Sequence, residues 1–143
     1  MTRSEPDAGA AFLDTNVLVY AYDTRYPAKQ EVARQTVRAG GLFVSAQVLG
    51  EFYWTVTRKL ATPLRPEVAR EVVDRWPSDF VIPVTAGMVR DAVATSQRSQ
   101  LSYWDALIVA AAAAAGCGLL LTEDLQDGGA VSGVRIANPF AGL

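Results

Sequence analysis

Four carboxylates beside apolar segments are the side chains best suited to chemistry in this chain: Asp14, Glu51, Asp105 and Asp124. Crowded carboxylates repel one another, by about 4 kcal/mol per pair at ~4 Å and an effective dielectric of about 20, so such a cluster needs cations. Oxygen ligands without His or Cys suit Mg²⁺, with Mn²⁺ as the alternative, and these ions share their coordination with substrate phosphates. A cluster of the four acids would therefore favour metal-assisted hydrolysis of a phosphodiester bond.

The residue types that are missing narrow the chemistry further. The sequence has no His, which excludes Ser-His-Asp and Cys-His nucleophilic schemes and His-based zinc sites. The single cysteine, Cys117, excludes an intramolecular disulfide and a cysteine zinc cluster, and it fits a reducing compartment. Chemistry near neutral pH must then use carboxylates, the metals they bind, or the side chains of Lys, Tyr, Ser and Thr.

Each acid also has a local explanation, which the sequence alone leaves open. Asp14 could form an Asx-turn or cap the next helix, and Asp124 could cap a short helix. Asp105 could complete a capping box with Ser102. Glu51 stands in a largely apolar stretch, where an unpaired buried carboxylate would be costly, although it could instead face solvent. A divalent cation would supply the partner charge that a buried Glu51 needs.

Apolar runs and helical periodicity alternate along the chain. They predict strands at 11–13, 42–44, 80–84, 119–121 and 134–136, and helices at 28–39, 45–60, 85–98 and 102–115, with another beginning near Pro66. Strands separated by helices of this length form crossover connections, so the predicted class is α/β, with a mainly parallel sheet covered on both faces. Ligands of such sheets bind beyond the carboxyl ends of the strands, where Asp14 and Asp124 fall.

Composition favours one folded domain over residues 11–143, since half of the residues are hydrophobic and a fifth are charged. Residues 1–10 are polar, lack the apolar run of a signal peptide, and are expected to form a flexible tail. The uncharged stretch 106–121 is interrupted at Gly116 and Gly118, so we expect a buried helix and a strand there, and a cytoplasmic protein.

The charge balance does not by itself indicate a nucleic-acid protein. The formal net charge is −2, from 13 basic and 15 acidic residues. If four carboxylates bind metal, 11 acidic residues remain against 13 basic ones, and bound cations would reverse the potential of the site.

Four segments, taken in order and with their spacing, carry a resemblance to a known family. They are Phe12–Leu18, Ser45–Phe52, Leu101–Ile108 and Leu121–Asp124. They resemble the four acidic motifs of PIN-domain proteins, and within that family the VapC-type toxins of bacterial and archaeal toxin–antitoxin pairs. The resemblance covers about residues 11–138, which is nearly the whole chain.

The resemblance implies a five-stranded, mainly parallel sheet and a metal-dependent endoribonuclease that leaves a 5′-phosphate and a 3′-hydroxyl. It implies that Asp14, Glu51 and Asp105 are the core metal ligands and that Asp124 is the fourth acid. It also implies a homodimer and a cognate antitoxin protein as partner. Polar positions implied to orient ligands or waters are Thr15, Asn16 and Thr122. Because the segment after Asp124 departs from the family pattern, Asp127 is an alternative that could replace or assist Asp124.

Aromatic and basic side chains leave two interpretations open. Six aromatic residues could stack on nucleobases, although packing in the core or an interface is favoured: Tyr20, Tyr22, Tyr53, Trp54, Tyr103 and Trp104. Four basic residues could contact phosphates or form a solvated face: Arg25, Lys29, Arg58 and Lys59.

Two rival functions also follow from the sequence. One is an aspartyl phosphotransferase with Asp14 as nucleophile, which is disfavoured because the position two residues later is Asn16 and the only lysines are Lys29 and Lys59. The other is a non-catalytic binding module that keeps the fold and pairs with another chain through its apolar helices.

Overall fold

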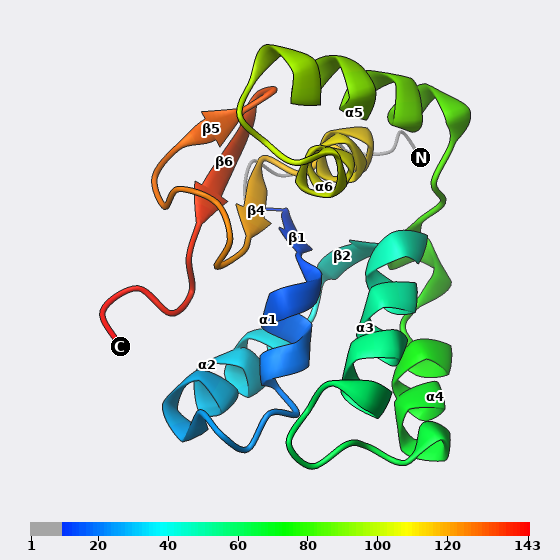
Figure 1. The fold of residues 1–143 in the computed structure, drawn as a ribbon, viewed down its shortest axis with the longest axis vertical. Helices are drawn as coiled ribbons and strands as arrows, with labels where there is room; N and C mark the ends of the chain where they lie inside the picture. The colour runs from blue at the N-terminus through cyan, green and yellow to red at the C-terminus, as the bar shows by residue number, and fades with distance from the viewer. Residues whose placement is uncertain (1–9) are drawn as a thin grey trace, which may run out of the picture.

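A six-stranded sheet in the order β3-β2-β1-β4-β6-β5 forms the centre of the fold (Figure 1). This computed structural model describes residues 10–143, so the predicted tail lies outside the described residues except for Ala10. The strands are β1 (Ala11–Leu13), β2 (Leu42–Ser45), β3 (Val81–Ile82), β4 (Leu119–Leu121), β5 (Ala130–Val131) and β6 (Val134–Ala137). The helices are α1 (Thr15–Tyr20), α2 (Pro27–Arg38), α3 (Ala46–Arg58), α4 (Pro66–Arg75), α5 (Ala86–Arg98) and α6 (Tyr103–Ala114), with a 3₁₀ turn at Ser78–Phe80.

The predicted α/β class with a mainly parallel sheet is confirmed, and the sheet has one strand more than the five expected. All pairs are parallel except that of β5 with β6. The extra strand belongs to a hairpin whose two turn residues, Ser132 and Gly133, have φ angles of 51° and 79°. A two-residue turn with both φ angles positive matches the twist of paired strands, which explains the hairpin.

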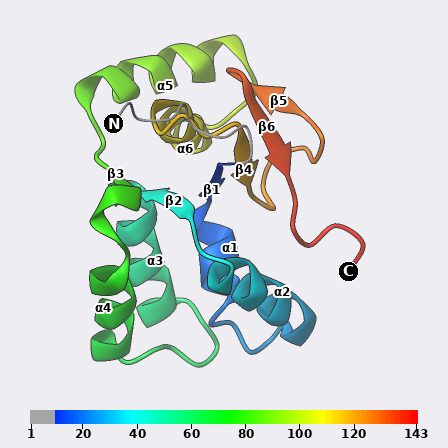
Figure 2. The same cartoon turned by 180° about the vertical axis from the view of Figure 1, so that it is seen from behind.

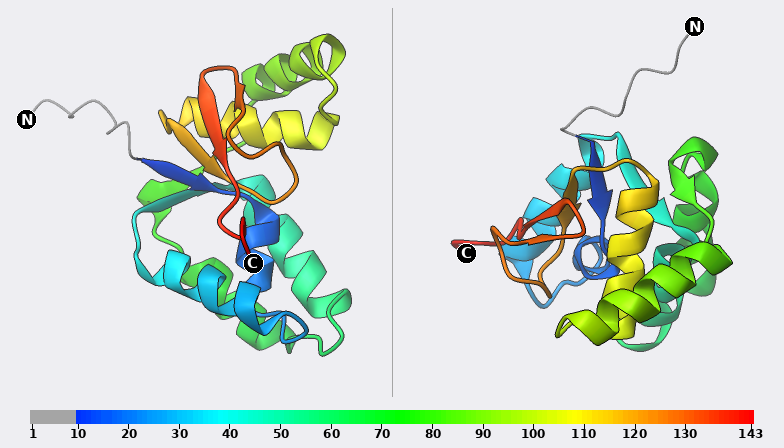
Figure 3. Two further views of the ribbon diagram at one scale, coloured as in Figure 1. Left: turned by 90° about the vertical axis from the view of Figure 1, so that its left-hand side faces the viewer. Right: turned by 90° about the horizontal axis from the view of Figure 1, so that it is seen from above.

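Helices lie on both sides of the sheet because the chain reverses its direction across it. It runs outward from β1 to β3 and then returns past β1 to β4, so right-handed crossovers place the two groups of helices on opposite faces. Figure 1 shows α5 and α6 above β1 and β2 and α1 to α4 below them, and Figure 2 shows the same division from behind. Figure 3 shows α5 packed along α6.

Helix α3 shows how the core also shapes a functional face. Val48, Phe52 and Val56 recur every fourth residue and are fully buried in the core. Glu51 lies on another face of the same helix and is exposed. The core thereby fixes the orientation of α3, and with it the direction in which Glu51 projects.

Predicted element ends agree with the structure within about two residues, and the third strand is the one strand that is shortened at both ends. The predicted strand 80–84 is only Val81–Ile82, because Ser78–Phe80 forms a 3₁₀ turn and Pro83 has no N–H to continue the pairing. Among residues 10–143, none of the helices combines the length and apolar character needed to cross a membrane.

Candidate metal centre

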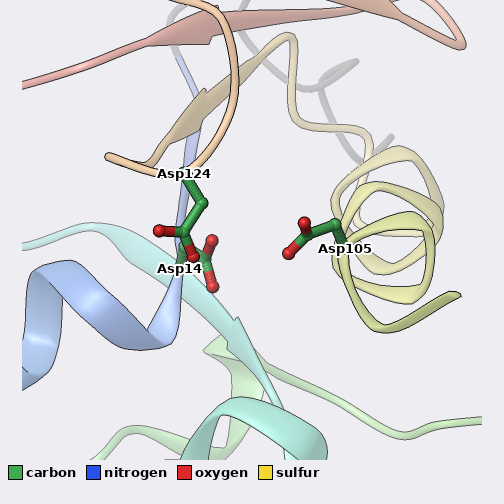
Figure 4. Close-up of side chains that lie close together, drawn as sticks. All are labelled: Asp14, Asp105 and Asp124. Carbon is green, nitrogen blue, oxygen red and sulfur yellow. The ribbon is translucent and has the colours of Figure 1, made fainter. Parts of the chain in front are cut away.

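Three of the four predicted acids meet at the carboxyl edge of the sheet. Asp14 follows β1 and Asp124 follows β4, and these strands are neighbours: the backbone N–H of Asp14 donates to the carbonyl of Leu121 at 3.0 Å. Asp105 projects toward them from the first turn of α6 (Figure 4). One carboxylate oxygen from each acid lies within 4.8 Å of the other two, a spacing that one or two cations could bridge.

Glu51 lies in the same cleft as these three acids but outside the tight group. The cleft has a volume of about 370 Å³, and all four carboxylates line it. The hydroxyl of Thr15 donates to a carboxylate oxygen of Glu51 at 3.3 Å. Glu51 is exposed, so of the two positions that the sequence left open, the structure adopts the solvent-facing one, directed into the cleft.

One threonine hydroxyl connects the two strand ends. Thr122 is fully buried, and its hydroxyl donates to Asp14 at 2.7 Å. The same oxygen accepts the backbone N–H of Asp124 at 3.1 Å and the side-chain amide of Asn16 at 3.4 Å. The second oxygen of Asp14 accepts the N–H of Thr15 at 2.6 Å. Each of the predicted orienting residues therefore contacts an acid or its neighbour.

The local explanations for three of the acids have different outcomes. Asp14 does cap α1 through the N–H of Thr15, and Ser102 caps α6 by accepting the N–H of Asp105 at 3.1 Å. Both carboxylates nevertheless belong to the acid group, so capping and clustering coexist. Asp124 caps no helix, because the segment after β4 forms bends and a turn.

Burial and crowding shift the protonation of the acids. Burial raises the pKa of Asp14 to about 7, opposed by its hydrogen bonds from Thr122 and Thr15 and reinforced by the charges of Asp124 and Asp105. Partial burial, with neighbouring acids, also raises the pKa of Glu51 and of Asp105. Because burial and mutual repulsion disfavour the ionised form of these carboxylates, a bound cation would stabilise the site.

The donor set fits a divalent metal ion. Within residues 10–143, the ion pairs are Arg25–Asp23, Lys29–Glu123 and Arg70–Asp74, so no basic side chain neutralises the four acids. The ligands on offer are all oxygens, as Mg²⁺ and Mn²⁺ prefer. Gln47, which lines the cleft, has a buried carbonyl oxygen without a hydrogen-bond partner among the described residues, and such an unsatisfied acceptor beside the acids fits a site that would hold a hydrated ion.

A second cluster, which the sequence reasoning missed, holds the segment that carries Asp124. The Glu123 carboxylate pairs with Lys29 at 2.5 Å and accepts from the Tyr20 hydroxyl at 2.7 Å. Burial opposes ionisation of Glu123, but these two partners outweigh it and lower its pKa. The position of Glu123 between Thr122 and Asp124 in the sequence indicates that it lies near the acids. Its partners, Tyr20 on α1 and Lys29 on α2, could not be identified from the local sequence.

Asp127 occupies a different place from Asp124. Its carboxylate accepts the backbone N–H of Asn138 at 2.8 Å, which ties the turn after β4 to the end of β6. It is exposed and is not among the residues that line the cleft. Its geometry is that of a turn-stabilising residue.

Comparisons with known proteins agree with this fold. A family model, the PIN domain, matches residues 11–126. A toxin–antitoxin complex from Klebsiella pneumoniae contains a similar chain, at 20% identity and TM-score 0.69, over 91% of this chain and 98% of that one.

Two further solved structures are similar. VapC20 of Mycobacterium tuberculosis, described as a sarcin-ricin loop cleaving toxin, matches at 19% identity and TM-score 0.60, over 80% of this chain and 89% of that one. DNA-bound VapBC from Salmonella typhimurium matches at 19% identity and TM-score 0.62, over 92% and 98%. A comparison with curated protein sequences found no match.

Proposed function

The chain belongs to the PIN domain family, and from that premise we propose that it is a metal-dependent endoribonuclease acting as the toxin of a toxin–antitoxin pair. One observation carries the proposal: carboxylate oxygens of Asp14, Asp105 and Asp124 lie within 4.8 Å of one another in a cleft, and no basic side chain of residues 10–143 forms an ion pair with them. An arrangement of this kind is suited to a divalent cation and a substrate phosphate.

In this proposal Asp14, Glu51, Asp105 and Asp124 hold Mg²⁺, or Mn²⁺ in its place. Such ions, when bound, lower the pKa of water and stabilise the attacking and leaving oxygens of a phosphodiester. Hydrolysis would leave a 5′-phosphate and a 3′-hydroxyl.

The remaining polar residues position the acids. Thr122 holds Asp14 and the backbone of Asp124 through a single hydroxyl, so the carboxylates from two strand ends keep their spacing. Thr15 donates to Glu51 across the cleft. Because burial raises the pKa of Asp14 to about 7, a substantial fraction of this carboxyl is protonated at neutral pH in the metal-free protein, and a bound cation would favour its ionised form.

The aspartyl phosphotransferase is less well supported than the nuclease. Lys29 is paired with Glu123, which leaves Lys59 as the lysine of the cleft, and the position two residues after Asp14 is Asn16, where such an enzyme would have a second acid. The non-catalytic module is the outcome to expect if the acids bind no metal or cleave no RNA.

The partner proposal rests on the similar chains. The Klebsiella structure is a toxin–antitoxin complex, and we extend that pairing to this chain, with a cognate antitoxin protein. We also propose that the chain forms the homodimer that its resemblance to the family implies. Sedimentation of the purified protein tests the second point, since a homodimer has twice the 15.3 kDa mass of the chain. A single-chain mass at micromolar concentration would contradict it.

Cleavage of a mixed pool of 5′-labelled RNA by purified, partner-free protein tests the proposed activity. We expect discrete fragments with Mg²⁺ or Mn²⁺, none with EDTA, and none from Asp14→Asn. Asp91→Asn, on the exposed side of α5, serves as the matched control and should cleave like the wild type. Equal cleavage by wild type and Asp14→Asn, or inert wild type at all metal concentrations, would contradict the proposal.

A further inference from the structure

Trp104 is an exposed aromatic residue at the proposed metal site. Its side chain lines the cleft that holds the four acids, and it is 62% exposed. It directly precedes Asp105 in the first turn of α6. A large apolar ring therefore faces solvent one residue away from a proposed metal ligand.

The backbone that carries this ring is well anchored. Ser102 caps the helix at this turn, and the side-chain amide of Gln47 on α3 donates to the carbonyl of Trp104 at 3.5 Å. The Tyr103 ring makes an edge-to-face contact with the indole, with centroids 4.9 Å apart at 71°. The indole thus projects from a fixed helical turn, which is a suitable platform for a planar ligand.

Trp104 differs from two other exposed aromatic rings, those of Trp54 and Tyr26, because basic side chains lie against both of them. The Arg58 guanidinium lies 3.9 Å above the ring of Trp54, and Arg25 and Lys29 lie 5.4 and 5.6 Å from the centre of the Tyr26 ring. Within residues 10–143, no cation lies over Trp104 in this way. Of the aromatic side chains among residues 10–143 that line the cleft, Trp104 is the most exposed.

Two basic residues in the same cleft make it suitable for a polyanion. Arg25 is fixed by Asp23 through hydrogen bonds of 3.1 and 2.9 Å, and its side chain remains half exposed. Lys59 lines the cleft and belongs to none of the ion pairs formed by residues 10–143. A ligand stacked on Trp104 would therefore have cations for its phosphates and acids for its metal within one cleft.

We propose that Trp104 stacks on an unpaired nucleobase of the RNA beside the phosphate that is cut, and so restricts cleavage to single-stranded segments. This inference rests on the proposed ribonuclease function. Aromatic side chains stack on any base that is not already covered by its neighbours, which excludes the interior of a duplex. A second copy of this chain is the rival occupant, and the oligomeric state of Trp104→Leu distinguishes it from an RNA base.

Tryptophan fluorescence and cleavage kinetics together test the proposal. The probes are a short mixed-sequence single-stranded RNA and the same sequence as a duplex, with Ca²⁺ for binding and Mg²⁺ for cleavage. Trp104→Leu removes the ring, Trp104→Phe keeps an aromatic face, and Trp54→Leu removes a comparably exposed tryptophan outside the cleft as the matched control.

We expect the single-stranded RNA, but not the duplex, to quench the fluorescence of wild type and of Trp54→Leu, and the quenching to be lost in Trp104→Leu. The KM for the single strand should rise about ten-fold to one-hundred-fold in Trp104→Leu, with a smaller change in kcat and most of the loss restored in Trp104→Phe.

Other outcomes separate this inference from the nuclease proposal. Normal cleavage with an unchanged KM in Trp104→Leu would overturn the stacking role while leaving the nuclease intact. Quenching assigned to Trp104 in a protein that cleaves nothing would support stacking and reject the nuclease. A dimer that becomes monomeric only in Trp104→Leu would overturn the inference, because the ring would then belong to a protein interface.

Discussion

Thr122 donates a 2.7 Å hydrogen bond to Asp14 from a fully buried position, and this bond joins the ends of β4 and β1. The two residues are 108 positions apart in the sequence, so only the pairing of parallel neighbouring strands brings them together. The same hydroxyl accepts the backbone N–H of Asp124. A single oxygen thus sets the spacing of two proposed metal ligands.

Thr122→Val should lower kcat/KM about ten-fold to one-hundred-fold with little change in volume, because it removes the donor to Asp14 and the acceptor for Asp124. Thr122→Ser, which keeps the hydroxyl, should retain most of the activity. Steady-state cleavage in saturating Mg²⁺ measures both. Equal losses in the valine and serine variants would indicate that packing of the methyl group, and not the hydroxyl, is what matters.

The stability of the metal-free protein should depend on Asp14 in a defined direction. Burial raises the pKa of Asp14 from 3.8 to about 7, so between these values the folded state holds a proton that the unfolded state releases. The free energy of unfolding contributed by this group is therefore present at low pH and lost as pH rises through about 7.

Asp14→Asn should consequently stabilise the metal-free protein at pH 8, by up to about 4 kcal/mol, and by less at pH 5. Urea unfolding in EDTA at the two pH values measures the difference. Saturating Mg²⁺ should reduce the advantage, since the ion binds only the wild-type folded state well. A variant less stable than wild type by the same amount at both pH values would contradict the shifted pKa.

The ion pair of Lys29 with Glu123 should affect metal binding more than stability. Both side chains are more than a quarter exposed, so breaking the pair should cost at most about 1 kcal/mol. Glu123 precedes Asp124, however, and its bonds to α1 and α2 restrain that segment. Lys29→Met and Glu123→Gln should each weaken Mn²⁺ binding, and the double variant should be little worse than either single one. Arg70→Met, which breaks the exposed pair of Arg70 with Asp74 on α4, is the control and should leave Mn²⁺ binding unchanged. If the losses of Mn²⁺ affinity in the two single variants add up in the double variant, the two residues do not act as a pair.

Asp124 and Asp127 should behave differently when each is changed to Asn. Asp124→Asn removes a carboxylate from the acid group and should abolish most cleavage, whereas Asp127→Asn should leave cleavage near wild type, because Asp127 holds the N–H of Asn138. Asp127→Asn should instead loosen the turn after β4, which hydrogen exchange at Asn138 would detect. Greater loss of cleavage in Asp127→Asn would reverse the assignment of the fourth acid.

Elements with strong local signals could be predicted from the sequence. Ser102 followed by an apolar run interrupted only at Asp105 predicted α6 within one residue at each end, and the three-residue runs that form β1 and β4 were predicted in full. The approach of Asp14 to Asp124 followed from their position after parallel strands.

Features determined by distant contacts could not be predicted in the same way. The salt bridge of Lys29 with Glu123 spans 94 positions, and no local pattern pairs them. Strand β5 has two residues, too few for an alternation of apolar and polar positions to show. The Ser132–Gly133 turn that follows it is its one local feature, and the strand was not predicted. The sequence did not decide whether Glu51 is buried or exposed. Even an apolar helix exposes one face, and that face is set by the side that packs into the core, which here carries Phe52.

Binding of Mn²⁺, measured by electron paramagnetic resonance as the loss of the free-ion signal, tests the central claim that the acid cluster is a metal centre. We expect saturable binding by wild type and by Asp91→Asn, loss of at least ten-fold in affinity in Asp14→Asn, and weaker binding as the pH falls below about 7, where Asp14 becomes protonated. Equal Mn²⁺ binding by wild type and Asp14→Asn, or no saturable binding by either, would contradict it.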